Sequence, residues 1–230
     1  MVFGGDGSDT INWTTGDGAD TVEGEAGSDV LAITDSGTIA VDLSGPRPQV
    51  GSVDTAGFEL IDINGSGLAD TVSVTGTAGD DEISIMPSGA AIEITGLSVD
   101  LAVTGGEALE LDSGQGNDHL DVTGHTVTIA TNTSVISGAT TADITYENLE
   151  SASVFTNAGV QLTVGGSAGY SVVPNAAADE GTILTDSLTV EYDGFGAGTT
   201  ISIDGDLEIT ASAPSQRLFL FIISMLYLKI

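Results

Sequence analysis

Aspartates that end glycine-rich turns are the residues of this chain whose type and spacing best suit chemistry. The stretch GGDGSDTIN at residues 4–12 ends its turn with Asp9, and GEAGSDVLA at residues 24–32 ends its turn with Asp29. Glycine readily adopts left-handed backbone angles, which can bring carbonyl oxygens close to the carboxylate. A hard cation such as Ca²⁺ takes about six to eight oxygen ligands of these two kinds. We therefore predict calcium ligands at Asp9, Asp29, Gly5, Gly7 and Gly27.

Both stretches fit a nine-residue template, G-G-x-G-x-D-x-U-x, in which U is a large apolar residue. Residues 4–12 match every fixed position, residues 15–23 (TGDGADTVE) lack only the first glycine, and residues 24–32 lack only the second, which is Glu25. Weaker copies stand at 65–73, 76–84 and 113–121. The later copies add candidate ligands at Asp20 and, in the weaker copies, at Asp70, Asp81 and Asp118. For these last three an alternative stays open, in which the carboxylate accepts backbone N–H bonds in the turn.

Short strands must position these turns. Runs such as TIAVDL (38–43), EISIM (82–86) and TVTIA (126–130) alternate apolar and polar residues between glycine-rich turns, and no segment keeps a helical period. A longer repeat aligns residues 58–76 with residues 106–124 without gaps, an offset of 48. Short strands in a repeating frame predict an all-β fold built as a parallel β-solenoid. An antiparallel β-sandwich is the alternative, although a sandwich does not need such a repeat.

The charge of the chain is strongly one-sided. Its 34 acidic residues face only three basic ones, and Arg47 is the single cation before residue 217, so the net charge is −31. Binding to nucleic acid is excluded as a function, because phosphate contacts need clustered lysine and arginine. Bound divalent cations would offset the repulsion between the carboxylates. A solvated acidic coat without a specific metal, as in halophilic proteins, is the alternative.

We do not expect the chain to be an enzyme. A glycan-active β-helix enzyme is the rival interpretation, since paired carboxylates can cleave glycosidic bonds. An anionic substrate would be repelled by the net charge, however, and no nucleophile motif with an oriented base is present. His119 and His125 flank one turn, and we interpret them as surface imidazoles, because a zinc site in a chain without cysteine would have to recruit carboxylates.

The nine-residue units at 4–32 resemble those of the RTX, or haemolysin-type, family of secreted calcium-binding repeat proteins, and the units at 65–121 are similar to them more loosely. The resemblance implies a parallel β-roll in which each unit forms half a coil and Ca²⁺ lies between turns stacked on one edge. It also implies a structural or adhesive segment of a longer bacterial protein, located outside the cell or on its surface. Cell-surface glycans or other surface proteins would then be its partners.

The roll that this resemblance implies can be compared with the spacing of the aspartates. Asp9 and Asp29 are 20 residues apart, one coil of 18 plus the insertion at 13–14, so they should lie on one edge of successive coils and share an ion. Asp20 should lie on the opposite edge, with its partner near Thr38, where no aspartate turn exists. Asp70 and Asp118, 48 residues apart, should be too distant to share an ion, and Asp81 should lie across the roll from Asp70.

Composition divides the chain into four segments. Residues 1–43 hold the nine-residue units, residues 52–158 hold the 48-residue frame, and residues 159–214 continue the strands without aspartate turns. Residues 215–230 form an atypical hydrophobic tail that we interpret as non-native, with a truncated membrane anchor or a buried capping strand as alternatives. Its eleven-residue apolar run from Leu218 to Leu228 is shorter than the roughly 18 residues that indicate a membrane span.

Overall fold

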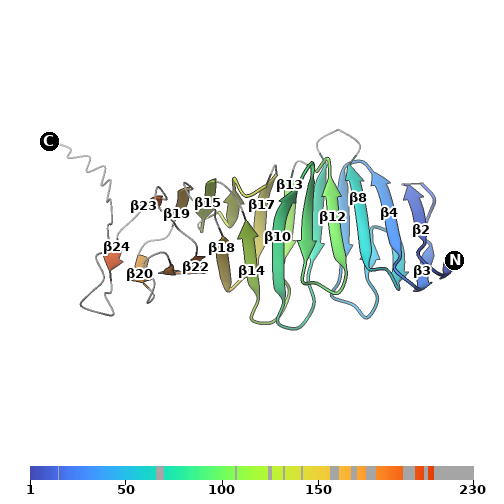
Figure 1. Cartoon of the computed structure of the whole chain (residues 1–230), viewed down its shortest axis with the longest axis horizontal. Coiled ribbons are helices and arrows are strands. Elements are labelled where there is room, and N and C mark those ends of the chain that lie inside the picture. The colour runs from blue at the N-terminus through green and yellow to red at the C-terminus, as the bar shows by residue number, and fades with distance from the viewer. Residues whose placement is uncertain are drawn as a thin grey trace.

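Two large sheets, built from short strands, make up the part of the chain that the structure describes. The structure is a computed structural model that describes residues 1–14, 16–65, 70–106, 108–123, 126–131, 133–140, 142–155, 161–166, 170–174, 180–193, 200–204 and 207–209. Every regular element within these ranges is a β-strand. The strands form two twelve-stranded sheets along the long axis of the molecule (Figure 1). The predicted all-β fold is therefore confirmed.

Sheet A contains, in spatial order, β1 (Val2–Asp6), β3 (Thr21–Ala26), β7 (Val53–Ala56), β6 (Gln49–Val50), β5 (Thr38–Asp42), β9 (Thr71–Thr75), β13 (Ala108–Asp112), β17 (Asp143–Glu147), β16 (Val135–Ser137), β15 (Thr126–Ala130), β19 (Gln161–Gly165) and β23 (Thr200–Asp204). Sheet B contains β2 (Thr10–Thr14), β4 (Val30–Asp35), β8 (Leu60–Gly65), β12 (Asp100–Thr104), β11 (Ala91–Thr95), β10 (Glu82–Ser88), β14 (His119–Thr123), β18 (Ser151–Phe155), β22 (Thr189–Asp193), β21 (Gly181–Leu184), β20 (Tyr170–Pro174) and β24 (Leu207–Ile209).

The alternating sequence pattern explains why these segments are strands with one buried face. In β4, Leu31 and Ile33 are buried while their neighbours are at least partly exposed, and Ile39 and Val41 are buried in the same way in β5. Side chains of a strand point alternately to the two faces of its sheet, so every second residue enters the core between the sheets. Burying one such aliphatic side chain contributes about 1.5–3 kcal/mol.

Most strand pairs are parallel, and the antiparallel pairs are confined to four three-stranded meanders among the described residues. These meanders are β5–β7, β10–β12, β15–β17 and β20–β22. The predicted alternative, an antiparallel sandwich, is therefore not the observed arrangement. In each meander the first strand lies farthest along the molecule, and the next two fold back to fill the gap that it leaves.

The meanders define a structural repeat of five strands, which we call a unit. The units are β5–β9, β10–β14, β15–β19 and β20–β24, and their first strands begin at residues 38, 82, 126 and 170, 44 residues apart each time. Each unit places a meander in one sheet, one strand in the other sheet and one strand back in the first. The next unit does the same with the two sheets exchanged.

The repeat of these units accounts for the 48-residue frame. Residues 58–76 contain β8 and β9, and residues 106–124 contain β13 and β14, which are the last two strands of consecutive units. The frame is therefore a true structural repeat. Its equivalent strands lie in opposite sheets, however, because β8 belongs to sheet B and β13 to sheet A.

The segment divisions at residues 43, 52 and 159 remain predictions. Hydrogen-bonded pairs cross the first division, since β3 pairs with β7 and β5 pairs with β9. The loop at 44–48 connects β5 to β6 inside the first unit. The tail at 215–230 lies outside the described residues. Within the described ranges we find no helix with the length and apolar character that crossing a membrane requires.

Candidate functional site

The turns that begin the nine-residue units share one backbone conformation. In four of them the residues at the second and fourth template positions have positive φ angles. These residues are Gly5 (105°) and Gly7 (122°), Gly16 (107°) and Gly18 (104°), Glu25 (73°) and Gly27 (156°), and Gly114 (101°) and Gly116 (143°). Glu25 is the only one of the eight that is not glycine, so the position at which its unit departs from the template carries backbone strain.

The first and third turns stack directly on each other. The N–H of Gly7 donates to the carbonyl oxygen of Ala26 at 2.8 Å, and a Cβ on Gly27 would overlap the carbonyl oxygen of Gly7. A Cβ on Gly4 would likewise lie 2.6 Å from the carbonyl oxygen of Gly24. Glycine is needed here for close approach, because any side chain would push successive turns apart.

Asp9 and Asp29 lie on one edge of successive coils, as the spacing predicts. They immediately precede β2 and β4, which pair in parallel. The N–H of Asp9 donates to Oδ1 of Asp29 at 2.8 Å, and the N–H of Asp29 donates to Oε2 of Glu59 at 2.7 Å. Glu59 precedes β8, the next strand of sheet B. We call the series Asp9, Asp29 and Glu59 acid ladder 1. The second and third carboxylates each accept the backbone N–H of the residue before them in the series.

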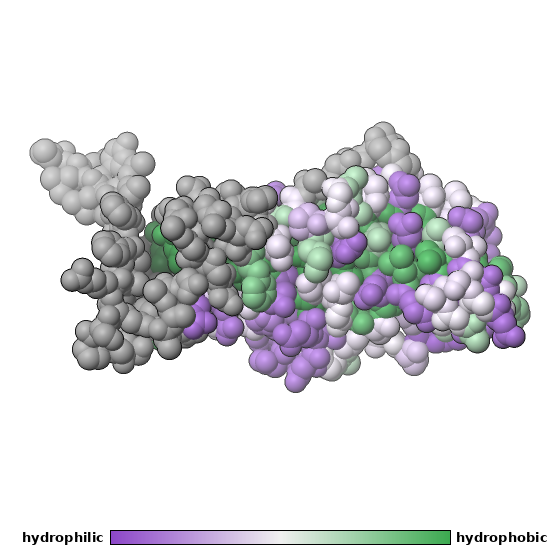
Figure 2. Space-filling view, in the orientation of Figure 1, coloured by the Kyte–Doolittle hydropathy of each residue, from purple (hydrophilic) through white to green (hydrophobic). Residues whose placement is uncertain are grey.

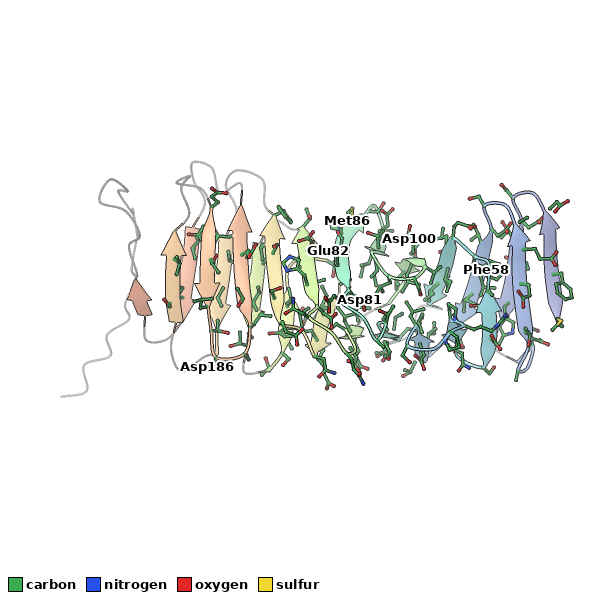
Figure 3. All side chains as sticks on the ribbon, turned by 90° about the horizontal axis from the view of Figure 1, so that it is seen from below. Phe58, Asp81, Glu82, Met86, Asp100 and Asp186 are labelled. Carbon is green, nitrogen blue, oxygen red and sulfur yellow. The ribbon has the colours of Figure 1, made fainter. Side chains whose placement is uncertain are left out.

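The same arrangement recurs before β10, β14 and β18. The N–H of Asp81 donates to Oδ1 of Asp118 at 2.9 Å, and the N–H of Asp118 donates to Oε2 of Glu150 at 2.8 Å. Asp81 also accepts two hydrogen bonds from Thr77, one from its N–H and one from its hydroxyl, both at 2.8 Å. We call Asp81, Asp118 and Glu150 acid ladder 2. Figure 3 labels Asp81 where the chain enters β10.

Both ladders lie on the edge where the chain enters sheet B. Strands β4, β8 and β14 of sheet B point upward in Figure 1, so this edge is the lower one, and hydrophilic residues gather there below β10 and β14 in Figure 2. Each ladder ends in the same way, because the residue before the fourth strand is apolar and buried, Val99 after ladder 1 and Leu188 after ladder 2.

The middle carboxylate of each ladder is wholly buried. Asp29 and Asp118 have 0% of their surface exposed, and Oδ2 of each is buried with no hydrogen-bond partner. The Oδ2 atom of Asp9 is in the same condition. A buried polar atom normally has a partner, and a buried charge is usually paired or bound to a metal.

Neither ladder has a cation beside it among the described residues. Arg47 is 2.8 Å from Glu23 and 2.5 Å from Asp54, both on the outer face of sheet A. These contacts hold the pKa of Arg47 above its ordinary value, with the hydrogen bond to Asp54 as the larger cause and that to Glu23 as the next. The N-terminal ammonium lies 3.8 Å from Asp20.

Asp20 and Asp70 precede strands of sheet A and therefore lie on the opposite edge. The expected partner position of Asp20 at Thr38 is wrong, because the meander places β7, and not β5, beside β3. The residue before β7 is Ser52, whose hydroxyl donates to the carbonyl oxygen of Gly18 at 3.2 Å. Oδ1 of Asp70 accepts the N–H of Gly37 at 2.5 Å.

Asp70 and Asp118 lie apart, as predicted, but the reason is not the number of coils between them. They lie on opposite edges because their units exchange sheets, and Asp81 lies across from Asp70 as expected. The pair that sequence reasoning missed is Asp81 with Asp118. The hydrogen bonds of Asp70, Asp81 and Asp118 agree with the alternative of N–H acceptors, although Asp70 and Asp118 accept from a neighbouring coil and only Asp81 accepts from its own turn.

The sequence contained a signal for the glutamate that ends each ladder. Glu59 opens the 48-residue frame, and YENLESASV at 146–154, a degenerate third copy, contains Glu150. Each glutamate immediately precedes a strand, and each accepts the N–H of the middle aspartate of its ladder.

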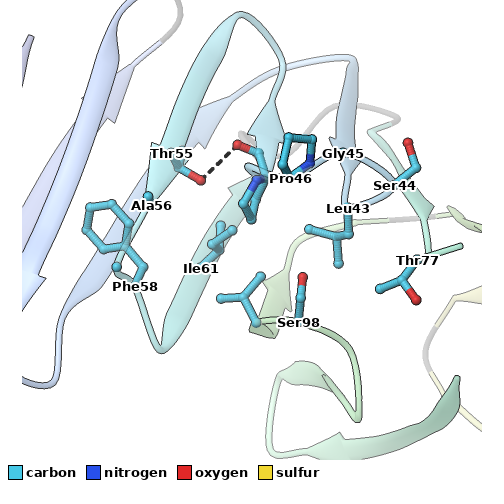
Figure 4. Close-up of a pocket in the computed structure, with 13 residues that line it drawn as sticks. Leu43, Ser44, Gly45, Pro46, Thr55, Ala56, Phe58, Ile61, Thr77 and Ser98 are labelled. Carbon is cyan, nitrogen blue, oxygen red and sulfur yellow. Dashed lines mark hydrogen bonds between the residues drawn. The ribbon is translucent and has the colours of Figure 1, made fainter. Parts of the chain in front are cut away.

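A hollow of about 370 Å³ lies on the surface where the loop after β5 meets the turn after β7 (Figure 4). Its walls include Leu43, Phe58 and Val99, and one side is fixed by a hydrogen bond of 3.1 Å from the hydroxyl of Thr55 to the carbonyl oxygen of Pro48. None of the described residues that line it has an ionisable side chain. The hollow therefore offers apolar contact but no acid or base.

No family model matches the chain, and no curated protein or solved structure is detectably similar to it. The resemblance of residues 4–32 to RTX units thus remains a prediction that rests on the residues themselves.

Proposed function

We propose that the chain is a calcium-binding β-solenoid segment with a structural or adhesive role in a longer extracellular bacterial protein, and that it is not catalytic. The observation that carries this proposal is the buried middle carboxylate of each acid ladder. Asp29 and Asp118 are fully buried, each keeps one oxygen without a protein donor, and no described cation lies beside either.

Electrostatics favour a bound cation at this edge. Successive strands are about 4.8 Å apart, so stacked carboxylates lie at a comparable spacing. Two like charges about 5 Å apart repel by roughly 3 kcal/mol at an effective dielectric constant of about 20. A divalent cation converts this repulsion into attraction, and the chain has almost no basic residues that could do the same.

The donor set suits calcium. Within the first turn, Oδ2 of Asp9 and the carbonyl oxygen of Gly24 both lie close to the position of a Cβ on Gly4, at 3.3 and 2.6 Å. A carboxylate oxygen and a carbonyl oxygen from successive coils therefore both lie next to the same glycine. Ca²⁺ accepts mixed carboxylate and carbonyl ligands in flexible geometry, whereas Mg²⁺ demands a near-ideal octahedron.

The solenoid part of the proposal rests on the path of the chain. The chain alternates between two mostly parallel sheets, and equivalent turns stack along one edge, so each unit buries its apolar face against its neighbours. Repeats of this kind form extended rods, and ions bound between their turns would stiffen them. A spacer or an adhesion module on a cell surface needs such a rod.

Calcium titration of the full chain tests the proposal. Binding is followed by calorimetry and the melting temperature by circular dichroism, for the wild type and for Asp29→Asn and Asp118→Asn, which keep the Oδ1 acceptor and remove the charge. Asp62→Asn is the matched control, because Asp62 is an exposed aspartate of β8 whose strand neighbours are Ala32 and Ala102.

The wild type should melt higher in calcium, and each ladder variant should lose one binding event that the control keeps. The Asp9→Ala, Asp29→Ala double variant should also lose one. A ligand present at about 100 times its dissociation constant stabilises by about 2.7 kcal/mol per site. If millimolar calcium leaves the melting temperature unchanged while sodium chloride raises it, the acidity is a solvated coat and the proposal fails.

A further inference from the structure

A second group of side chains that could bind a metal ion lies on the outer face of sheet B, whereas the middle carboxylates of the ladders are buried. Glu82, His119 and Ser151 occupy one cross-strand row of β10, β14 and β18, because they are register partners in two parallel pairs. Asp121 stands two residues after His119, so it lies on the same face, in the next row. The intervening Leu120 is buried in the core, which confirms that this row faces outward.

The three ionisable side chains converge. One carboxylate oxygen of Glu82, one ring nitrogen of His119 and one carboxylate oxygen of Asp121 all lie within 4.8 Å of one another. Nε2 of His119 is 3.1 Å from Oδ1 of Asp121. Neighbouring ligand atoms in a tetrahedral zinc site, at about 2.0–2.1 Å from the metal, are roughly 3.3 Å apart, so the pair already has the required separation. Glu82 is exposed, and its carboxylate can close the remaining gap by side-chain rotation.

Neighbouring hydroxyls fix the orientation of the imidazole. Nδ1 of His119 is 2.7 Å from the hydroxyl of Ser151, and that hydroxyl is 3.5 Å from the carbonyl oxygen of Asp118, to which it donates. In the tautomer that carries its hydrogen on Nδ1, the Ser151 hydroxyl accepts the Nδ1–H. Nε2 then carries the lone pair and lies 3.1 Å from Oδ1 of Asp121 and 2.8 Å from the hydroxyl of Ser153, so a cation can bind between the nitrogen and the carboxylate. A metal-binding histidine characteristically donates its second ring N–H to a neighbouring acceptor.

We propose that Glu82, His119 and Asp121 form a binding site for a divalent transition-metal ion of the zinc type on the outer face of sheet B. Imidazole nitrogen is a ligand for zinc and its neighbours in the periodic table, whereas calcium takes oxygen ligands. Two carboxylates balance the charge of the ion, and three protein ligands leave a fourth position open to water or to a partner's side chain. The site is independent of the calcium proposal, because it uses a different ion and takes no ligand from the ladder residues.

The test is the binding of Zn²⁺ to the full chain, measured by calorimetry with millimolar Ca²⁺ present throughout to occupy sites that take only oxygen ligands. Co²⁺ serves as a spectroscopic probe, because its visible absorption reports a tetrahedral site with a nitrogen ligand. The variants are His119→Gln, Glu82→Gln and Asp121→Asn, and Asp62→Asn is again the matched control on the same sheet.

The wild type and the control should bind one Zn²⁺ with the same affinity, and each ligand variant should bind it at least tenfold more weakly. Ser151→Ala removes no ligand and should weaken binding by about tenfold, in line with the usual cost of losing such a support. The exposed Glu82 keeps the test valid if His119→Gln does not fold. Zn²⁺ binding that survives both Glu82→Gln and His119→Gln, or an absence of Zn²⁺ binding by the wild type, would overturn the proposal whatever calcium does.

Discussion

Glu25→Gly should stabilise the N-terminal coil, because Glu25 holds a φ of 73° where the equivalent residues of the other turns are glycines. A left-handed conformation costs a non-glycine residue about 1–2 kcal/mol. Glycine avoids this cost but loses about 0.5–1 kcal/mol through the greater freedom of the unfolded chain. The expected net gain is therefore about 0.5–1 kcal/mol. Gly5, the register partner of Glu25, has a φ of 105° and shows that the turn accepts glycine without rearrangement.

Hydrogen exchange gives the most direct assay, because repeat proteins open locally and the effect should be confined to the first coils. The N–H of Gly7, which donates to Ala26, should exchange about two- to fivefold more slowly in the variant. A shift of about 1–3 °C in melting temperature should accompany it. Glu25→Gln removes the same charge and keeps the Cβ. If the glutamine variant stabilises as much as the glycine variant, charge and not backbone strain is the cause, and the reasoning is wrong.

Three further predictions concern closely packed or buried groups, each measured by urea unfolding. Gly27→Ala should cost clearly more than Gly5→Ala, because a Cβ on Gly27 would overlap the carbonyl oxygen of Gly7 whereas the space around Gly5 is open; equal costs would contradict the stacked turns. Without calcium, Asp118→Ala should be about 1–3 kcal/mol less stable than Asp118→Asn, since both remove the charge but only alanine leaves a buried backbone N–H without its acceptor. Burial raises the pKa of Tyr146, so the stability of the protein is unaffected by this group below the unfolded-state pKa near 10 and falls as the pH rises through the higher folded-state value. Tyr146→Phe should be neutral or stabilising near pH 7, because the hydroxyl has no partner, and should reduce the alkaline loss of stability.

The local features of the fold follow from the sequence because they depend on neighbouring residues. Alternation of apolar residues predicts the strands, and the glycine positions predict turns whose φ angles are indeed positive. The stacking of Asp9 and Asp29 follows from counting residues along the first coils, where no meander intervenes.

The order of the strands could not be predicted in the same way. Parallel and antiparallel strands show the same alternation, so the fold-back of β5–β7 left no mark in the pattern. The proline-containing loop at 44–48 looks like a boundary, yet it is the turn that starts this fold-back. The triad around His119 was missed because its members come from strands 37 residues apart, which become neighbours only after the meander is placed.

The exchange of sheets between units has a consequence for how this chain can change in length. Two consecutive units contribute five strands to each sheet, an advance of about 24 Å at the usual strand spacing of about 4.8 Å. Loss of a single unit would present every downstream surface on the opposite side of the rod, whereas loss of two would only shorten it. The parity of the unit count therefore sets which side a distal binding surface faces. Duplication in pairs changes reach, and duplication of one unit changes direction.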